Sequence, residues 1–84
     1  MYFMEEKIRN KIKDFKDKAE YFLDNDIKAF IKDKNDSWYF CDILLVGDIA
    51  LTVYSFAGKK IGNKDRILWI DVEDIKEYKQ EEKE

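Results

Sequence analysis

The hydrophobic pattern of this chain changes its period once, near residue 26, and that change limits the folds available to it. Before this point, apolar side chains recur every three or four residues, as on one face of an α-helix. The stripe consists of Met4, Ile8, Ile12, Phe15, Ala19 and Phe22. After it, apolar and polar residues alternate in short runs, the pattern of β-strands. We therefore predict one helix over residues 4–23 and a sheet over residues 26–78.

Turn-forming residues divide the second region into five short runs. The predicted strands span residues 27–32, 38–46, 49–56, 66–71 and 75–78. The connections are a polar turn at 33–36, Gly47-Asp48, a Gly- and Lys-rich segment at 57–65 and an acidic turn at 72–74. The run 38–46 is apolar on both faces, which is typical of a strand that bends through a barrel or sandwich core. The sequence predicts an α+β fold in which an N-terminal amphipathic helix precedes a five-stranded antiparallel barrel.

The chain has 84 residues, the size of one small domain. We place that domain at residues 1–78, with the barrel over 26–78, and expect a disordered acidic tail at 79–84. A domain of this size buries only roughly 60% of its unfolded surface, so it commonly gains stability from a disulfide, a metal or self-association. Cys41 is the only cysteine and histidine is absent, which leaves self-association. We therefore expect a homo-oligomer.

No segment of the sequence predicts export or membrane insertion. The first residues lack the basic region and the long apolar region of a secretory signal. The longest apolar run, Ile43–Val46, is far shorter than the roughly 20 residues of a membrane span. A lone cysteine inside an apolar run fits a buried structural thiol in a reducing compartment. We expect a cytoplasmic protein with no membrane partner.

The residue types argue against catalysis. Because histidine is absent, Cys41 has no imidazole that would activate it as a nucleophile. The glycines at 58 and 62 do not form the Gly-Lys-Ser/Thr ending of a phosphate-binding P-loop. The carboxylates of residues 71–77 could surround a divalent cation, but we interpret them as a solvated turn. We expect a protein that is not an enzyme and that binds no metal and no cofactor.

The segment 46–53 reads VGDIALTV and starts the predicted third strand. Together with one helix followed by five sequential antiparallel strands, it resembles the Sm-like fold, a small barrel that usually assembles into rings. In that family the third strand follows a turn that carries an aspartate; Asp48 matches this position and Leu51 matches the usual methionine. The resemblance covers residues 5–78. An open SH3-like sheet would give nearly the same alternation and stays as the alternative.

The resemblance does not extend to the family's uridine pocket. Members that bind uridine stack the base on an aromatic ring or histidine, pair it with asparagine and clamp it with arginine. The matching positions hold Ala50, Thr52 and Asp71. Ala50 cannot stack on a base, Thr52 lacks the paired donor and acceptor of an amide, and Asp71 would repel phosphate. We expect no uridine pocket of the family type.

Charge is unevenly distributed along the predicted helix. The net charge of the chain is −3, yet residues 7–18 hold six basic and two acidic side chains, a surplus of four. These cations would form two flanks of the helix: Lys7, Lys11 and Lys18 on one, Arg9, Lys13 and Lys16 on the other. A basic flank can follow a phosphate backbone, with Lys11 and Lys18 as candidate contacts. The alternative is a solvated helix whose lysines confer solubility.

The connection at 58–66 is the strongest candidate for a binding site. It carries four cations, Lys59, Lys60, Lys64 and Arg66, and a single anion. The aromatic residues Phe56 and Trp69 flank it in sequence. Cations beside exposed aromatic rings suit single-stranded nucleic acid, because bases stack on the rings while the cations hold phosphates. The alternative is a mobile hairpin tip.

Six aromatic residues in the predicted strands could belong either to the core or to a surface platform. They are Trp38, Tyr39, Phe40, Tyr54, Phe56 and Trp69. Strand aromatics usually pack in the core, but a platform for bases or a subunit contact would use the same residues. The sequence therefore predicts a small Sm-like oligomer that associates with RNA through the basic loop and helix. The alternative is an SH3-like protein-interaction module that binds no nucleic acid.

Overall fold

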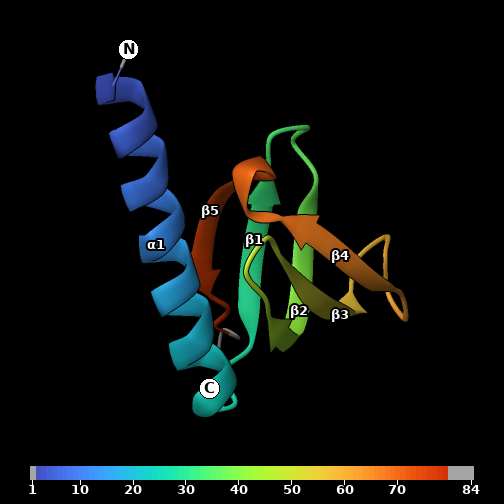
Figure 1. The fold of residues 1–84 in the computed structure, drawn as a ribbon. Helices are drawn as coiled ribbons and strands as arrows, with labels where there is room; N and C mark the ends of the chain where they lie inside the picture. The colour runs from blue at the N-terminus through green and yellow to red at the C-terminus, as the bar shows by residue number, and fades with distance from the viewer. Residues whose placement is uncertain (1, 80–84) are drawn as a thin grey trace.

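The computed structural model describes residues 2–79, and the side chains of residues 6–79, as one helix and one antiparallel sheet (Figure 1). The elements are α1 (Tyr2–Asp24), β1 (Ala29–Asp33), β2 (Trp38–Val46), β3 (Ala50–Ala57), β4 (Lys64–Leu68), the 3-10 turn η1 (Trp69–Asp71) and β5 (Val72–Glu77). The helix-then-sheet architecture predicted from the change of period is confirmed.

The five strands form a single sheet in the order β4-β3-β2-β1-β5. The first four strands are joined as sequential hairpins, and β5 returns to pair with β1, with Ile75 opposite Ile31. This return places β4 and β5 at the two edges of the sheet. Pairing between β2 and β3 shifts register between Phe40 and Cys41 and again between Ile43 and Leu45. Such irregularities bend a strand. The five strands form one antiparallel sheet, and the barrel predicted from the apolar character of both faces of β2 stays a prediction.

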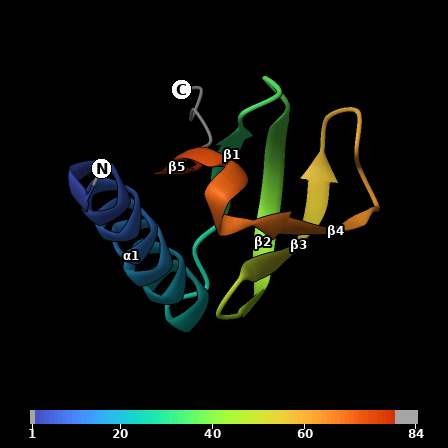
Figure 2. The ribbon, with the colours of Figure 1, turned by 45° about the horizontal axis from the view of Figure 1, so that its top comes forward.

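Helix α1 packs its C-terminal half against one side of the sheet, which we call the inner face (Figure 2). Ala19 and Phe22 are buried there, and Ile12 and Phe15 pack against the same cluster. The helix ends where Asp26 adopts a left-handed conformation, with φ of 58°. The Ile27 amide then donates to the Phe22 carbonyl at 2.8 Å, which turns the chain toward β1.

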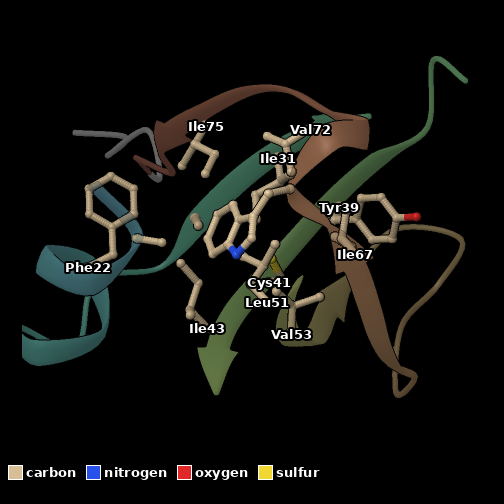
Figure 3. Close-up of a cluster of buried hydrophobic side chains, with 13 residues drawn as sticks. Phe22, Ile31, Tyr39, Cys41, Ile43, Leu51, Val53, Ile67, Val72 and Ile75 are labelled. Atoms are coloured by element: carbon tan, nitrogen blue, oxygen red, sulfur yellow. The ribbon is translucent and has the colours of Figure 1, made fainter. Parts of the chain in front are cut away.

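The core lies between α1 and the inner face (Figure 3). Trp69 belongs to the same buried cluster. Its buried side chains alternate along the strands, as Ile31 on β1, Cys41 on β2 and Val53 on β3 illustrate. Trp69 is only 2% exposed, and its indole N–H donates to the Gly47 carbonyl at 2.8 Å. The indole therefore fastens η1 to the β2–β3 turn while its ring fills the core.

The C-terminal part of the sheet differs from the sequence prediction. A strand was expected over 66–71 and a turn over 72–74, but the turn is η1 and residues 72–74 already pair with β1. The Trp69 amide donates to the Ile49 carbonyl, and the Asp71 carbonyl accepts from the Lys34 amide. These contacts close the turn three residues earlier than its acidic composition predicted. The expected disordered tail lies outside the described residues except for Lys79.

The remaining strand boundaries agree with the prediction to within two residues, and β2 has the predicted ends. The prediction of a buried thiol is also confirmed, since Cys41 is fully buried. Among the helical residues that the structure describes, no stretch is long and apolar enough to cross a membrane.

Candidate nucleic-acid interface

The face of the sheet opposite the core, which we call the outer face, carries a series of aromatic rings in mutual contact. Along β2, Tyr39 and Cys41 point into the core, whereas Trp38 and Phe40 alternate with them and are only partly covered. Phe30 on β1 lies directly across from Phe40. Strand alternation therefore brings aromatic side chains from two neighbouring strands to one surface.

Three of these rings stack in parallel, and we call them the aromatic column. The centroids of Trp38 and Phe30 are 4.2 Å apart with 11° between the planes, and those of Phe30 and Phe40 are 4.6 Å apart with 26°. Phe30 thus lies between the other two. At the Phe40 end, Tyr78 meets the column edge-on with centroids 5.7 Å apart. Tyr78 also contacts Phe56 edge-on at 5.2 Å.

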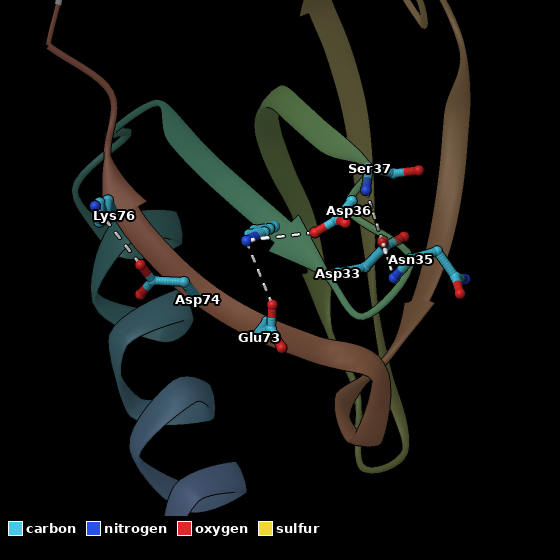
Figure 4. A network of polar contacts seen from close by, with 8 residues as sticks. Asp33, Asn35, Asp36, Ser37, Glu73, Asp74 and Lys76 are labelled. Atoms are coloured by element: carbon cyan, nitrogen blue, oxygen red, sulfur yellow. Dashed lines mark hydrogen bonds and ion pairs between the residues drawn. The ribbon is translucent and has the colours of Figure 1, made fainter.

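The β1–β2 turn, which leads into Trp38, is held by the buried carboxylate of Asp33 (Figure 4). One carboxylate oxygen accepts from the Asn35 and Ser37 amides at 2.9 and 3.0 Å. The other accepts from the Tyr39 hydroxyl at 3.1 Å. Because three donors converge on one side chain, the backbone before Trp38 has a fixed path.

Two groups beneath this surface have strongly shifted acidities. Burial, together with the hydrogen bond to the Asp33 carboxylate, raises the pKa of Tyr39 to about 12. Burial also raises the pKa of the Cys41 thiol to about 12, with smaller contributions from the charges of Asp42 and Asp65. Both side chains are therefore neutral at physiological pH, and the thiol is not a nucleophile there.

The β3–β4 loop folds back beside the aromatic column. Gly58 and Gly62 adopt positive φ values of 83° and 85°. The Gly62 amide donates to the Ser55 carbonyl at 2.8 Å, and the Asn63 carbonyl accepts from the Ser55 amide at 3.0 Å. A Cβ atom at Gly58 would lie 3.1 Å from Cδ2 of Phe40. The loop is therefore held by hydrogen bonds to Ser55 of β3 and makes close contact with the column.

An open groove of about 620 Å³ separates the loop from the β1–β2 turn. Its lining includes Trp38 and Phe40 of β2, together with Gly58, Lys59, Lys60 and Asn63. Asp36 and Ser37 of the β1–β2 turn also line it. We call it the loop groove. It brings two cations of the predicted basic loop next to two partly exposed aromatic rings.

The other two predicted cations of the loop lie on the edge strand. Lys64 and Arg66 are exposed on β4, where they pair with Tyr54 and Thr52 of β3 on the outer face. Lys60 reaches the opposite way, with its Nζ 5.1 Å from the centroid of the Tyr39 ring. The four cations thus spread from the loop groove onto the exposed face of β4.

The two predicted helix contacts, Lys11 and Lys18, are exposed but lie elsewhere. Figures 1 and 2 place α1 and the β3–β4 loop on opposite sides of the sheet. Lys11 stands over Phe15, with Nζ 5.9 Å from the ring centroid, beside a small apolar cleft between α1 and η1. The structure therefore does not bring the helix cations and the loop cations into one site.

The aromatic partners of the loop differ from those predicted. Trp69, expected to flank the basic loop, is a core residue. Trp38 and Phe40 take that place, although they are about twenty residues earlier in the sequence. Among the six aromatics weighed as core or platform, Tyr39 and Trp69 are buried, and the other four face outward. The alternation of inward and outward residues along β2 could have identified Trp38 and Phe40 as surface residues. It was hard to recognise in the sequence because both faces of β2 are apolar.

The positions that match the family's uridine pocket are also located. Ala50 is buried at the start of β3, Thr52 is half-buried on the same strand, and Asp71 belongs to η1. Within residues 2–79, no three carboxylates or thiols gather as ligands for a metal ion. Comparison of the chain with protein-family models, with curated proteins and with solved structures gives no match.

Proposed function

We propose that this chain is a small Sm-like barrel protein that associates with RNA through the β3–β4 loop. One observation supports this function above the others: Lys59 and Lys60 line the same groove as Trp38 and Phe40. Lysines neutralise phosphates, and aromatic rings accept the faces of bases. A surface that binds RNA without reading its sequence needs both in one place.

The charge around the groove is consistent with a phosphate ligand. The lining of the groove contains two lysines, Lys59 and Lys60, and one acidic residue, Asp36. Lys64 and Arg66 extend the positive surface along β4. Each phosphate contact releases counterions, so affinity carried by these cations falls as salt rises. Because the net charge of the chain is −3, binding depends on this local surplus and not on a general attraction.

The helix cations Lys11 and Lys18 enter the proposal as a separate surface. They belong to α1, which lies on the far side of the sheet from the β3–β4 loop, so a short oligonucleotide held beside the loop would not reach them (Figure 1). We assign them a contribution only with longer RNA. Reversing their charge should therefore affect binding of a short oligonucleotide less than reversing the loop charges.

The Sm-like barrel and its self-association are part of the same proposal. The helix followed by five antiparallel strands supports the resemblance, and β4 and β5 are the two edge strands of the sheet. The edges differ in net charge, because β4 has two cations and one anion (Lys64, Arg66 and Asp65), whereas β5 has three anions and one cation (Glu73, Asp74, Glu77 and Lys76). Edge strands with opposite charge can pair between copies of one chain. Light scattering after size exclusion at low and high salt tests this association.

Fluorescence anisotropy with labelled 20-nucleotide RNA and DNA, at low and physiological salt, tests RNA binding. The variant Lys59→Glu/Lys60→Glu/Lys64→Glu should lose binding while its circular dichroism spectrum stays unchanged. For the unmodified chain, three phosphate contacts should give a slope of log affinity against log salt of about −2, at roughly −0.7 per contact on a single strand.

The matched control is Lys7→Glu/Lys13→Glu/Lys16→Glu, which changes the net charge by the same amount on α1. This control should retain most of the affinity. Equal losses of RNA affinity in the two variants would mean that binding depends only on the total charge of the protein. The loop would then no longer be the proposed binding site. An absence of binding at low salt would end the nucleic-acid proposal.

An SH3-like protein-interaction module is the second candidate, and exposed apolar residues favour it. Ile49 is 66% exposed at the β2–β3 turn, close to Ile70 of η1, which is 51% exposed. Apolar side chains grouped outside the core are typical of protein contacts. A partner recovered from native lysate after nuclease treatment, and lost in Ile49→Glu, would support this function. Recovery of RNA alone would count against it.

A further inference from the structure

We propose that Trp38 is the base-stacking position of the loop groove, so that the ligand is an unpaired base of single-stranded RNA. This inference rests on the proposed RNA association and adds to it a ligand class and a residue. It does not use the positions of the uridine pocket known in the resembling family. Its basis is the aromatic column on the outer face.

The column has one closed end and one open end, where the Lys32 ammonium group lies over the Trp38 ring. At the Phe40 end, the edge of Tyr78 approaches the rings and Gly58 packs against Phe40. At the other end is Trp38, which is 39% exposed and contacts Phe30 by a parallel stack. A further flat ring can extend a parallel stack only at its open end. The geometry therefore selects Trp38, and not Phe40, as the residue that receives a base.

The open end is held in position before any ligand arrives. The Asp33 carboxylate fixes the turn that precedes Trp38, and Phe30 supports the indole from one side. A ring whose orientation is already fixed loses little freedom when a base stacks on it. Trp also offers the largest aromatic surface of any side chain, which suits a contact that accepts any base.

Lys32 lies close to the indole and contributes to the site. Its Nζ is 5.3 Å from the centroid of the Trp38 ring. It also lies 3.5 Å from a carboxylate oxygen of Asp36 and 3.6 Å from one of Glu73. A base that stacks on the indole would displace the ammonium group from the ring. The two carboxylates keep it paired after that displacement, so the site can open at small cost.

Lys59 places the phosphates of the same nucleotide strand, because it lines the groove that Trp38 enters. Lys60 also lines this groove, but its Nζ lies 5.1 Å from the centroid of the Tyr39 ring. A strand that stacks a base on Trp38 would therefore carry its backbone past the loop. In a duplex the bases are already stacked on one another and their faces are not accessible. The site consequently discriminates single strands from duplexes.

The two tryptophans make a direct test possible without a label. Trp38 lines the groove, whereas Trp69 is buried in the core. We would titrate the unlabelled protein with a single-stranded 12-nucleotide RNA, its DNA counterpart and the RNA duplex, and record tryptophan fluorescence. Stacking should quench the Trp38 part of the emission with the single strands and not with the duplex. Equal quenching by RNA and DNA would show that the site reads the base and not the sugar.

The matched variants are Trp38→Leu and Trp38→Phe. Trp38→Leu should keep the circular dichroism spectrum, lose the quenching and weaken binding by about fivefold to a hundredfold. Its salt slope should stay unchanged, because the lysines remain. Trp38→Phe should recover most of the affinity. An RNA of the same length in which abasic sites replace the central bases should bind the unmodified protein as weakly as RNA binds Trp38→Leu.

Each outcome separates this inference from the proposed function. Anisotropy that shows RNA binding without quenching of Trp38, or with undiminished affinity in Trp38→Leu, would overturn the stacking site and leave the basic loop standing. No binding of any single strand at low salt would overturn both. Equal binding of duplex and single strand would also exclude stacking on Trp38.

Discussion

The inner and outer faces of the sheet both carry aromatic rings, but the rings are supported in different ways. On the inner face, Trp69 belongs to the buried apolar cluster and its indole N–H has a carbonyl partner. On the outer face, Trp38 stacks on another aromatic ring and otherwise borders the loop groove. Burial of apolar area makes the first ring a source of stability. The second is positioned but only partly buried, so it can accept a contact from outside.

The largest expected effect separates the two tryptophans by stability. Trp69→Ala should lower the free energy of unfolding by about 3–5 kcal/mol, because it leaves a cavity and removes the donor to Gly47. A loss of this size consumes much of the stability of a small domain. Trp38→Ala should cost only about 1 kcal/mol or less, since its ring is partly exposed. Urea unfolding followed by circular dichroism compares them, and similar losses would contradict the distinction between the faces.

The second effect concerns alkaline pH and the thiol under the outer face. The folded pKa of Cys41 is raised from 9.0 to about 12, so its contribution to stability is complete below pH 9.0 and is lost as pH rises toward 12. Tyr39, raised from 10.0 to about 12, adds to the loss in the same direction. At about 1.4 kcal/mol per pH unit between these limits, the thiol alone should remove about 4 kcal/mol from the free energy of unfolding.

The Cys41→Ala variant isolates that contribution, because the two proteins share every other titratable group. Its free energy of unfolding should decline less steeply with pH than that of the unmodified chain over the same range. Parallel pH profiles in urea unfolding would show that the thiol is already accessible in the folded state.

The third effect compares two aspartates of the β1–β2 turn. Asp33→Asn should destabilise the protein by about 1–2 kcal/mol, because hydrogen bonds from two amides and the Tyr39 hydroxyl converge on its charge. Asp36 is exposed and adopts a φ of 63°, a conformation that asparagine tolerates. Asp36→Asn should therefore change the free energy of unfolding by less than about 0.5 kcal/mol. Thermal unfolding of both variants compares these two losses of stability. A larger loss for Asp36→Asn than for Asp33→Asn would contradict the role of Asp33.

The smallest effect distinguishes two glycines of the β3–β4 loop. Both have positive φ, so alanine strains the backbone at either position by about 1 kcal/mol. Only at Gly58 would the added Cβ also press on the Phe40 ring, at 3.1 Å, whereas open space surrounds Gly62. Gly58→Ala should therefore lower the free energy of unfolding by roughly several tenths of a kcal/mol more than Gly62→Ala, because the Phe40 ring must move. Equal midpoints in urea would mean that the loop does not press on the column.

Much of the fold follows from the sequence because each helix and strand obeys its own period. The spacing of Ile12, Phe15 and Ala19 is sufficient to define the buried stripe of α1, and alternation is sufficient for β3. The failure at residues 69–71 has a tertiary cause. Trp69 and Ile70 are as apolar as strand residues, but hydrogen bonds to the β2–β3 turn hold them in a 3-10 turn instead. Local composition does not contain that contact.

The candidate site was only half predictable for a related reason. The cations of the loop are adjacent in the sequence, so Lys59 and Lys60 could be chosen directly. Their aromatic partners come from the beginning of β2, and the loop reaches them only because the sheet order brings β3 back beside β2. The helix cations were equally visible in the sequence, but the same topology places them on the other side (Figure 1).

The position of Cys41 has a consequence for kinetics. It lies at the centre of the sheet, with Ala29 opposite it on one side and Ser55 on the other, and it is the only thiol in the chain. A thiol-modifying reagent can reach it only when these strands part. The rate of modification under native conditions therefore counts how often the middle of the sheet opens. Cys41 is therefore a built-in probe of how often the least accessible part of the fold opens.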